Sequence, residues 1–231
     1  MKIDKGQLRT FYKGLRAALS DDELKGKSLK INEHVQFFLK DRSDLSHFHL
    51  FFPIPKQREI DTYPIKVSLE ERGCIVYTSR VESQTLKLET LRLVPGTEFQ
   101  FDKWGIPIPE EFDLVTNELI QVVFVPLLAY DGKGNRVGFG KGYYDVFLSS
   151  LEPSVLKIGL AFVVLLLVFC NVLESNAQMR DYNTMIGVTG GTNVGGTVKQ
   201  FVSEPGAIDL LVYRRWKGWV VSALYEHHLE N

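Results

Sequence analysis

The stretch "QVVFVPLLAYDGKGNRVGFGKGYYDVFLSSL" (residues 121–151) joins an uncharged run to a glycine-rich segment and then to an aromatic and acidic helix start. The run at 122–128 is nearly all apolar, as expected of a strand covered on both faces of a parallel sheet. Five of the nineteen glycines lie within residues 131–145, which indicates a loop there. A helix is expected over 142–151, so strand, loop and helix follow each other as in an α/β fold.

The segments on either side continue this alternation of strands and helices. Residues 5–19 have an amphipathic pattern at about 100° per residue, and the sequence "SDDE" has the form of a capping box that starts a second helix near Asp21. A further helix is expected to end at Gly73, with Asp61 or Thr62 as its N-cap. Other strands are expected at 47–54, 74–78, 86–94 and 156–162. We therefore predict an α/β fold with a largely parallel sheet flanked by helices.

The carboxyl-terminal part of the chain has a different composition. Glycine and threonine dominate residues 187–200, which we interpret as a loop or a linker. Residues 207–231 return to apolar character and are expected to form a strand and then a short helix. We divide the chain into a domain at 1–190 and a carboxyl-terminal extension of unknown role at 191–231.

The overall composition is that of an ordinary soluble protein of 231 residues with a net charge of −1. Such a charge provides no global basic field, so we expect no nucleic-acid partner. Cys74 and Cys170 lack paired spacing, which predicts a reducing, cytoplasmic location without a disulfide frame or a zinc site. The most apolar stretch, at 158–170, is shorter than the roughly twenty residues of a membrane span. We expect no membrane partner, and a monomer is slightly favoured.

The glycine-rich segment follows the carboxyl end of a strand, which is where open α/β sheets bind ligands. Gly138, Gly140 and Gly142 permit positive φ and close approach of a ligand to the backbone. The N–H groups beside them, together with the helix start that follows, could bind phosphate oxygens. The alternative is a glycine-rich hairpin that ends in a core-packed pair of tyrosines. The spacing matches neither common glycine motif for nucleotides, so it leaves both readings open.

Charged residues accompany these glycines. Arg136 and Lys141 add positive charge, and Asp145 could hold a Mg²⁺ ion that bridges phosphates, because Mg²⁺ prefers oxygen ligands. A stripe of four cations along the first helix is either a second phosphate-facing surface or a solvated helix face. Its members are Lys5, Arg9, Lys13 and Arg16.

Two further candidates lie between the glycine-rich segment and the first helix. Glu59 and Asp61 follow the strand at 47–54, where a carboxylate could bind a polar ligand; alternatively, Asp61 caps a helix and Glu59 lies on the surface. Trp104 precedes a proline-rich turn and could stack on a flat heterocycle, or it could be a core residue. The five histidines show no metal-ligand spacing.

Four stretches occur together in a fixed order: "KGQLRTFYKGLRAALSDDE", "FFPIPKQREIDT", "WGIPIPE" and "VPLLAYDGKGNRVGFGKGYYDVFL". The last is the most specific, because G-N-R-x-G-x-G-K-G-Y-Y-D follows an apolar strand that ends in V-P-x-L. Together they resemble the 5-formyltetrahydrofolate cyclo-ligase family, whose members are also called 5,10-methenyltetrahydrofolate synthetases. The resemblance covers residues 2–162.

The resemblance implies a fold of the kind shared with phosphosugar isomerases and coenzyme A transferases, with ATP and Mg²⁺ as co-reactants and a reduced folate, 5-formyltetrahydrofolate, as substrate. The implied products are 5,10-methenyltetrahydrofolate, ADP and phosphate. The implied ATP-binding residues are Lys5, Arg9, Arg136, Gly138, Phe139, Gly140, Lys141, Gly142, Tyr143 and Tyr144. The implied folate-binding residues are Glu59, Trp104, Phe139 and Tyr143, the metal ligands Asp145 and Asp181, and the catalytic residues Lys141 and Arg136.

Two positions depart from the family pattern. Leu165 stands near the place of an expected glutamine, and Met185 replaces an expected second carboxylate in the segment that offers Asp181 and Thr189. These departures leave a second hypothesis open, a nucleotide- or folate-binding protein of the same fold without turnover. A third hypothesis is a different transferase on this fold, although such a site has no need of a pterin platform.

Overall fold

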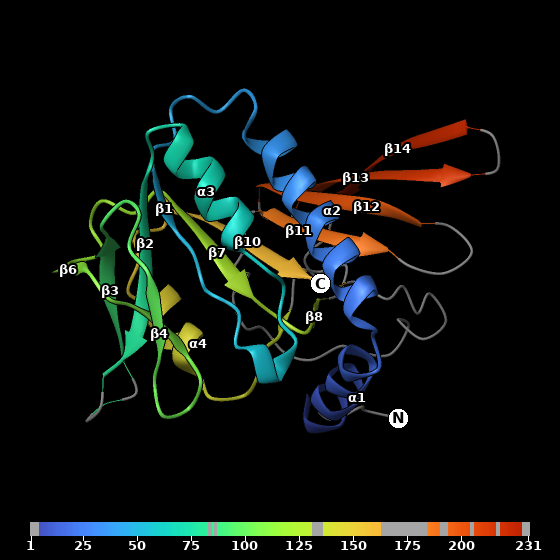
Figure 1. The fold of residues 1–231 in the computed structure, drawn as a ribbon. Helices are drawn as coiled ribbons and strands as arrows, with labels where there is room; N and C mark the ends of the chain where they lie inside the picture. Colours follow the sequence, from blue (N-terminus) through green and yellow to red (C-terminus); the bar gives the residue numbers. More distant parts are fainter. Residues whose placement is uncertain are drawn as a thin grey trace.

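The computed structural model describes residues 5–82, 85, 87–130, 136–162, 184–189, 194–203, 206–215 and 218–227, with side chains up to residue 162. The strands of its main sheet are β1 (His47–His49), β2 (Ile75–Val81), β3 (Leu88–Leu93), β6 (Phe112–Val115), β7 (Val122–Pro126), β10 (Leu156–Ala161), β11 (Thr184–Thr189), β12 (Val194–Ser203), β13 (Gly206–Arg215) and β14 (Gly218–His227). They form one ten-stranded sheet in the order β14-β13-β12-β11-β10-β7-β1-β2-β3-β6 (Figure 1).

The five central strands, from β11 through β10, β7 and β1 to β2, run parallel to one another. Antiparallel strands extend both edges, β12 to β14 on one side and β3 with β6 on the other. The predicted α/β fold is therefore confirmed, and its parallel part is the centre of the sheet. The parallel arrangement aligns the carboxyl ends of β1, β7 and β10 along one edge, where such sheets bind ligands.

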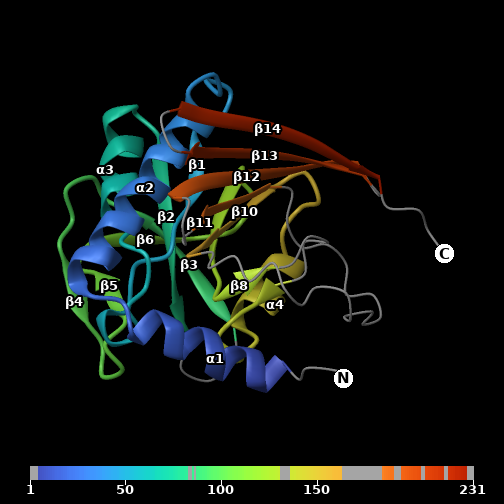
Figure 2. The ribbon, with the colours of Figure 1, turned by 90° about the vertical axis from the view of Figure 1, so that its right-hand side faces the viewer.

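Helices cover both faces of this sheet and its ligand-binding edge. They are α1 (Lys5–Ala17), α2 (Asp21–Leu39), a short 3-10 helix η1 (Pro55–Gln57), α3 (Tyr63–Glu71) and α4 (Tyr143–Ser149). Figure 2 shows α2 and α3 on one face, α4 on the other, and α1 below the sheet. Two small hairpins pair β4 (Phe99–Phe101) with β5 (Pro107–Pro109) and β8 (Ala129–Tyr130) with β9 (Arg136–Val137). Within the described ranges, no helix has the length and apolar character needed to cross a membrane.

Local sequence explains where α2 and α3 begin. Ser20 and Glu23 form the predicted capping box, since the Glu23 N–H donates to the Ser20 hydroxyl at 3.2 Å and the Ser20 N–H donates to Glu23 at 2.8 Å. The N-cap of α3 is Thr62, whose side chain makes no capping bond. The carboxylate of Asp61 instead accepts a bond from the Tyr63 N–H at 3.0 Å. Both residues proposed for this cap therefore lie at the helix start.

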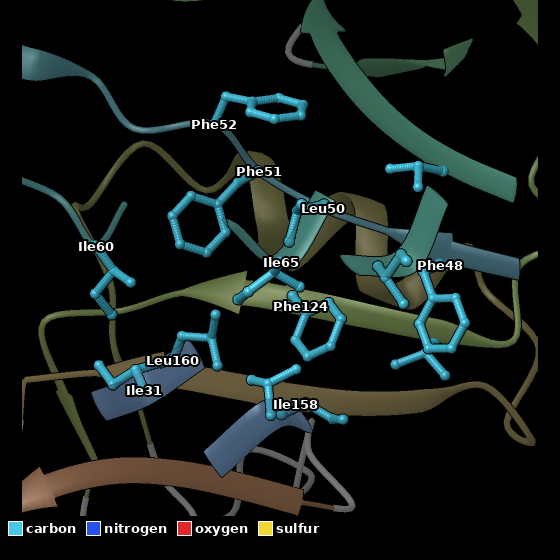
Figure 3. Packing of buried hydrophobic residues seen from close by; sticks show 14 of the residues in the cluster. Ile31, Phe48, Leu50, Phe51, Phe52, Ile60, Ile65, Phe124, Ile158 and Leu160 are labelled. Carbon is cyan, nitrogen blue, oxygen red and sulfur yellow. The ribbon is translucent and has the colours of Figure 1, made fainter. Parts of the chain in front are cut away.

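The alternation of side chains in the parallel strands produces two apolar clusters. Phe48, Phe124 and Ile158 point to the face covered by α2 and α3 (Figure 3). Val123 and Tyr77 point to the opposite face, where they pack with residues of α4. Because β7 is buried on both faces, its uncharged sequence is required by its position at the centre of the sheet.

Two expectations for the carboxyl-terminal part are wrong. The interpretation of 187–200 as a loop or linker is wrong for residues 187–189 and 194–200, which belong to β11 and β12 of the main sheet. Residues 207–231 form no helix in the part described; β13 and β14 pair as antiparallel strands over ten residues each. The valines and threonines of these segments favour strands, and the pairing partners satisfy their backbone groups.

The first parallel strand is also shorter than predicted. β1 ends at His49, and the chain from Leu50 onward leaves the sheet and passes through η1 before α3 begins. The left-handed Arg58 (φ 49°) closes η1. This path brings Glu59, which follows η1 in the chain, back against the protein interior.

Candidate functional site

The candidate site is built around residues 136–142, which we call the glycine segment. It begins in the hairpin of β8 and β9, where the Leu128 N–H donates to the Val137 carbonyl at 2.8 Å. Gly140 (φ 96°) and Gly142 (φ 77°) adopt the left-handed conformation, and Gly142 is the N-cap of α4. The predicted need for glycine is therefore confirmed at these two positions. The alternative of a hairpin is also realised in part, since β8 and β9 pair at the entry to the segment, and the amino terminus of α4 follows the segment.

The basic face of α1 packs against the glycine segment. The Nε atom of Arg9 donates to the Gly138 carbonyl at 3.1 Å. The Lys13 Nζ atom lies 5.7 Å and the Arg16 guanidinium carbon 5.4 Å from the centroid of the Phe139 ring. The alternative that this stripe is a solvated helix face is wrong for the buried Arg16 and the half-buried Arg9, whereas Lys13 is exposed beside the Phe139 ring. Phe11, which the periodicity places on the apolar face of the helix, is instead 46% exposed.

An ion pair joins the first residue of the glycine segment to the first turn of α4. Arg136, on β9, donates to the carboxylate of Asp145, in the first turn of α4. The Arg136 side chain is largely buried, whereas the Asp145 side chain is 70% exposed. Lys141 is exposed between them in the sequence. Positive charge, an accessible carboxylate and a helix amino terminus thus occur within one short segment, which suits a phosphate group with a cation.

A magnesium ion at this site would need oxygen ligands from nearby carboxylates. Among the described residues, no three His, Cys, Asp or Glu side chains gather into a metal-binding group. Mg²⁺ commonly keeps several waters and binds through one or two carboxylates together with substrate phosphates. A single exposed carboxylate at Asp145 fits that mode. The other predicted ligand, Asp181, lies outside the described residues.

Glu59 is buried rather than on the surface, so the alternative reading of this residue is wrong. Its Oε2 atom accepts a hydrogen bond from the Ile54 N–H at 2.9 Å. Burial raises the pKa of the Glu59 carboxyl, and the Ile54 N–H and the positive charge of Arg16 oppose that rise. Asp61, the other candidate there, is exposed at the start of α3.

Tyr144 and Arg16 are near enough to Glu59 for the charges to influence one another. Burial raises the pKa of the Tyr144 hydroxyl, the negative charge of Glu59 raises it further, and Arg136 lowers it. Tyr144 therefore stays protonated and can donate a hydrogen bond. Arg16 donates to the Leu127 carbonyl at 3.0 Å just beyond β7. Sequence reasoning placed Arg16 in the basic stripe but assigned it no role, because helix periodicity alone does not show which cation becomes buried.

A small pocket of about 20 Å³ opens beside Arg16 at the carboxyl ends of β7 and β10. Its lining consists of Tyr12, Leu15, Arg16, Leu19, Lys27, Leu128 and Phe162. The lining combines α1 with the strand ends, so the basic helix helps to form the ligand-binding edge of the sheet.

Trp104 lies on the turn between β4 and β5 and is 59% exposed, so the alternative that it is a core residue is wrong. The Asp102 carboxylate accepts bonds from the N–H groups of Trp104 and Ile106, both at 2.8 Å, which fixes the turn. The Lys103 Nζ atom lies 4.2 Å from the centroid of the indole ring. These contacts hold Trp104 on its own hairpin, with its ring accessible to a flat ligand.

Comparison with known proteins adds an independent finding. A sequence model described as the 5-formyltetrahydrofolate cyclo-ligase family matches residues 1–171. A 5-formyltetrahydrofolate cyclo-ligase of Mycoplasma genitalium is 29% identical over 162 residues, which cover 69% of this chain and 86% of that protein. The enzyme of the same name from Haemophilus influenzae is 30% identical over 161 residues, 68% of this chain and 84% of the relative.

Solved structures agree with these sequence relatives. A 5,10-methenyltetrahydrofolate synthetase from Mycoplasma pneumoniae matches with a TM-score of 0.55 at 26% identity, over 69% of this chain and 86% of that one. A 5,10-methenyltetrahydrofolate synthetase from Aquifex aeolicus matches with a TM-score of 0.59 over 79% and 89%; its 24% identity supports the fold alone.

Proposed function

The chain belongs to the 5-formyltetrahydrofolate cyclo-ligase family, and we propose that it cyclises 5-formyltetrahydrofolate to 5,10-methenyltetrahydrofolate with ATP as the phosphoryl donor. The observation that carries this proposal is the contact between α1 and the glycine segment, with Arg9 bonded to Gly138. Cations, left-handed glycines and a helix start meet there, a combination that suits the polyphosphate of a nucleotide.

The proposed reaction has two steps. The formyl oxygen of the substrate attacks the γ-phosphorus, the bond from that phosphorus to its bridging oxygen breaks, and ADP leaves. N10 of the folate then attacks the formyl carbon, the ring closes, phosphate departs with the former formyl oxygen, and N10 loses its proton to solvent. The first step turns a poor leaving group into a good one without a protein nucleophile, so the protein contributes positioning and charge stabilisation.

The charged residues of the site supply that stabilisation. Lys141 and Arg136 would neutralise the transferring phosphoryl group, and Lys5 and Arg9 would bind the remaining phosphates. Lys141 is exposed and can reach a ligand, whereas Arg136 is already held by Asp145. A magnesium ion would be held by Asp145, with Asp181 as a proposed second ligand, and would supply further neutralisation of the phosphate charge.

We propose that the folate contacts Glu59, Phe139, Tyr143 and Trp104. The buried Glu59 carboxylate is an acceptor for N–H groups of the pterin, and the exposed Trp104 ring offers a stacking surface. Phe139 belongs to the glycine segment, which also serves the nucleotide.

Three further properties are part of the proposal. A cytoplasmic location agrees with folate chemistry and with Cys74 being a free thiol. A monomer and a separate role for the extension at 191–231 remain predictions from the sequence.

The proposal is tested by mixing the protein with 5-formyltetrahydrofolate, ATP and Mg²⁺ and following the absorbance of the methenyl product together with ADP release. We expect one ADP for each methenyl product formed, and no product when ATP is omitted. Failure to detect ATP-dependent product at enzyme concentrations equal to the substrate would exclude the proposed activity.

A further inference from the structure

Arg58 has a backbone conformation that arginine rarely adopts. Among the residues that the structure describes, it is the one non-glycine residue with a positive φ, at φ 49° and ψ 47°. Glycine and asparagine adopt this left-handed conformation more readily than residues with long side chains. The contacts of the arginine side chain must therefore offset the strain, and residues held in this way are concentrated at functional sites. The next residue along the chain is Glu59, whose buried carboxylate is proposed to bind the folate.

The side chain of Arg58 is fixed at the corner between α1 and α2, which lies beside η1 (Figure 1). Its Nη2 atom donates to the Leu19 carbonyl at 2.6 Å, and its Nη1 atom lies 3.0 Å from a carboxylate oxygen of Asp21. Its Nε atom is buried and has no hydrogen-bond partner among the described residues. The Asp21 side chain is 93% exposed, so the ion pair contributes little and the bond to the Leu19 carbonyl is the stronger attachment. Leu19 itself packs against the apolar core, which makes this corner a firm anchor.

The turn that contains η1 also fixes the Glu59 side chain. Its Oε2 atom accepts the Ile54 N–H at 2.9 Å, so the carboxylate closes the turn from inside. At the base of the connection between β1 and α3, the Thr62 hydroxyl donates to the Phe51 carbonyl at 2.6 Å. The turn is therefore attached to the protein at its base through Thr62 and at its outer end through Arg58. Loss of the outer attachment leaves the Glu59 carboxylate on a turn that is held from one side.

We propose that Arg58 is a positioning residue for the reduced folate, because it ties the turn of η1 to the corner between α1 and α2 and so holds the Glu59 carboxylate in its binding position. The inference rests on the proposed function, which assigns Glu59 to the folate. A carboxylate on a loose turn samples several positions, and the ligand then binds more weakly because it must also order the turn. Glu59 binds the substrate without reacting, so Arg58 should affect the KM for folate and leave kcat nearly unchanged.

The test compares variants that separate the side-chain contacts from the backbone strain. Arg58→Asn removes the guanidinium and keeps a residue that tolerates the left-handed conformation. Arg58→Lys keeps a charged donor for the Leu19 carbonyl, and Asp21→Asn removes the ion pair alone. Arg72→Asn is the matched control, because its guanidinium also donates to a helix-end carbonyl, at 2.9 Å, but at the carboxyl end of α3. Arg58→Gly is a second variant in case the asparagine variant does not fold.

Two measurements follow the position of Glu59. Hydrogen exchange of the Ile54 amide reports its bond to Glu59 in the ligand-free protein, and calorimetry reports the affinity for 5-formyltetrahydrofolate. In Arg58→Asn we expect this amide to exchange about tenfold faster, and the folate affinity to fall about tenfold, with kcat within about twofold of the wild type. Arg58→Lys should recover part of the affinity. Asp21→Asn and Arg72→Asn should keep both quantities within about twofold, although Arg72→Asn should lower the melting temperature at least as much as Arg58→Asn.

The inference is overturned if the Ile54 amide exchanges at the same rate in the wild type and in Arg58→Asn, or if Arg72→Asn speeds the exchange as much. It is also overturned if the exchange changes while folate affinity stays the same, or if the wild type binds no reduced folate. Absence of methenyl product, with folate binding and its dependence on Arg58 intact, would reject the proposed activity and leave the role of Arg58 standing.

Discussion

A Cβ atom on Gly140 would lie 3.0 Å from the Nε atom of Arg9. The same Nε atom donates to the carbonyl of Gly138, two residues earlier. Arg9 therefore occupies the space that a side chain at residue 140 would need, and it bonds to the backbone beside it. The fit between α1 and the glycine segment depends on this missing side chain, because Gly140 also has a φ of 96°.

Replacing Gly140 with alanine should lower the free energy of unfolding by about 1–2 kcal/mol, because alanine is strained at positive φ and its methyl group displaces Arg9. ATP binding should weaken as well, since Arg9 loses its place. Gly138→Ala is the matched control, because Gly138 lacks a positive φ and its Cβ would meet nothing within 4 Å. Its stability should stay within about 0.5 kcal/mol of the wild type. Thermal unfolding with and without ATP measures both effects, and equal stability of the two variants would contradict the expectation.

Lys141→Ala should reduce turnover by about tenfold to a thousandfold, as when one preorganised charge-stabilising donor is lost. The folding stability should change little because Lys141 is exposed. Steady-state assays of methenyl product measure the change. Lys40→Ala, an exposed lysine at the end of α2, serves as the control and should keep full turnover. Full turnover in Lys141→Ala would show that this lysine has no part in phosphoryl transfer.

Asp145→Asn should raise the magnesium concentration needed for half-maximal turnover, by about tenfold or more, because an amide is a much weaker ligand for Mg²⁺ than a carboxylate. The variant also loses the charge partner of Arg136. Titration of turnover with MgCl₂ measures the requirement, with Asp113→Asn on β6 as a control for an exposed carboxylate. An unchanged magnesium requirement would place the ion elsewhere.

Trp104→Ala should raise the KM for 5-formyltetrahydrofolate about tenfold and leave the KM for ATP unchanged, because the indole is proposed to stack on the folate. Trp104→Phe keeps a ring and should lose much less. Since the side chain is 59% exposed, the melting temperature should stay the same in both variants. If both KM values rise, or if neither rises, Trp104 is not part of the folate site.

His49 provides a prediction about pH and folding. It is fully buried, its Nε2 atom lies 2.6 Å from the Ser79 hydroxyl, and burial lowers its pKa from 6.5 to about 3. Because the folded-state pKa is the lower one, the unfolded chain binds the proton first as the pH falls. Stability should therefore decline between pH 6.5 and about 3, by about 1.4 kcal/mol per pH unit from this residue. Denaturant unfolding of the wild type and of His49→Gln at several pH values measures this decline in the free energy of unfolding. An equal dependence on pH in the two proteins would contradict the prediction.

The sequence predicted the central fold because strong local signals specify it. The capping box at Ser20 and Glu23 marks the start of α2, and the uncharged run at 122–128 marks the strand buried on both faces. A strand was expected in the region of β13, but the residues of β14 were expected to form a helix. β12 was missed because the many glycines of residues 187–200 have the composition of a loop. Such a composition becomes a strand only when neighbouring strands supply hydrogen-bond partners, which is a tertiary effect.

The sequence predicted positive φ at two glycines of the candidate site, but it did not predict which of the charged residues are buried. The left-handed conformations at Gly140 and Gly142 follow from glycine spacing, which is a local property. The burial of Glu59 depends on a chain reversal through η1, and the burial of Arg16 depends on which face of α1 meets the strand ends. Apolar periodicity does not show which cation of α1 becomes buried; Arg16 lines a pocket together with Leu15 and Leu19 and lies beside the Phe139 ring.

The contacts that hold α1 also determine how easily this helix unfolds locally from the rest of the protein. Polar and cation–aromatic contacts hold this helix, with Arg16 as its buried side chain, whereas α2 and α3 are anchored in the apolar core. Elements with little buried apolar surface undergo local unfolding at a lower free energy than the core. Undocking of α1 would carry its cations away from the glycine segment while the sheet stays folded. A nucleotide bound to both α1 and the glycine segment would then keep the helix docked. Local unfolding of α1 would allow ADP to dissociate.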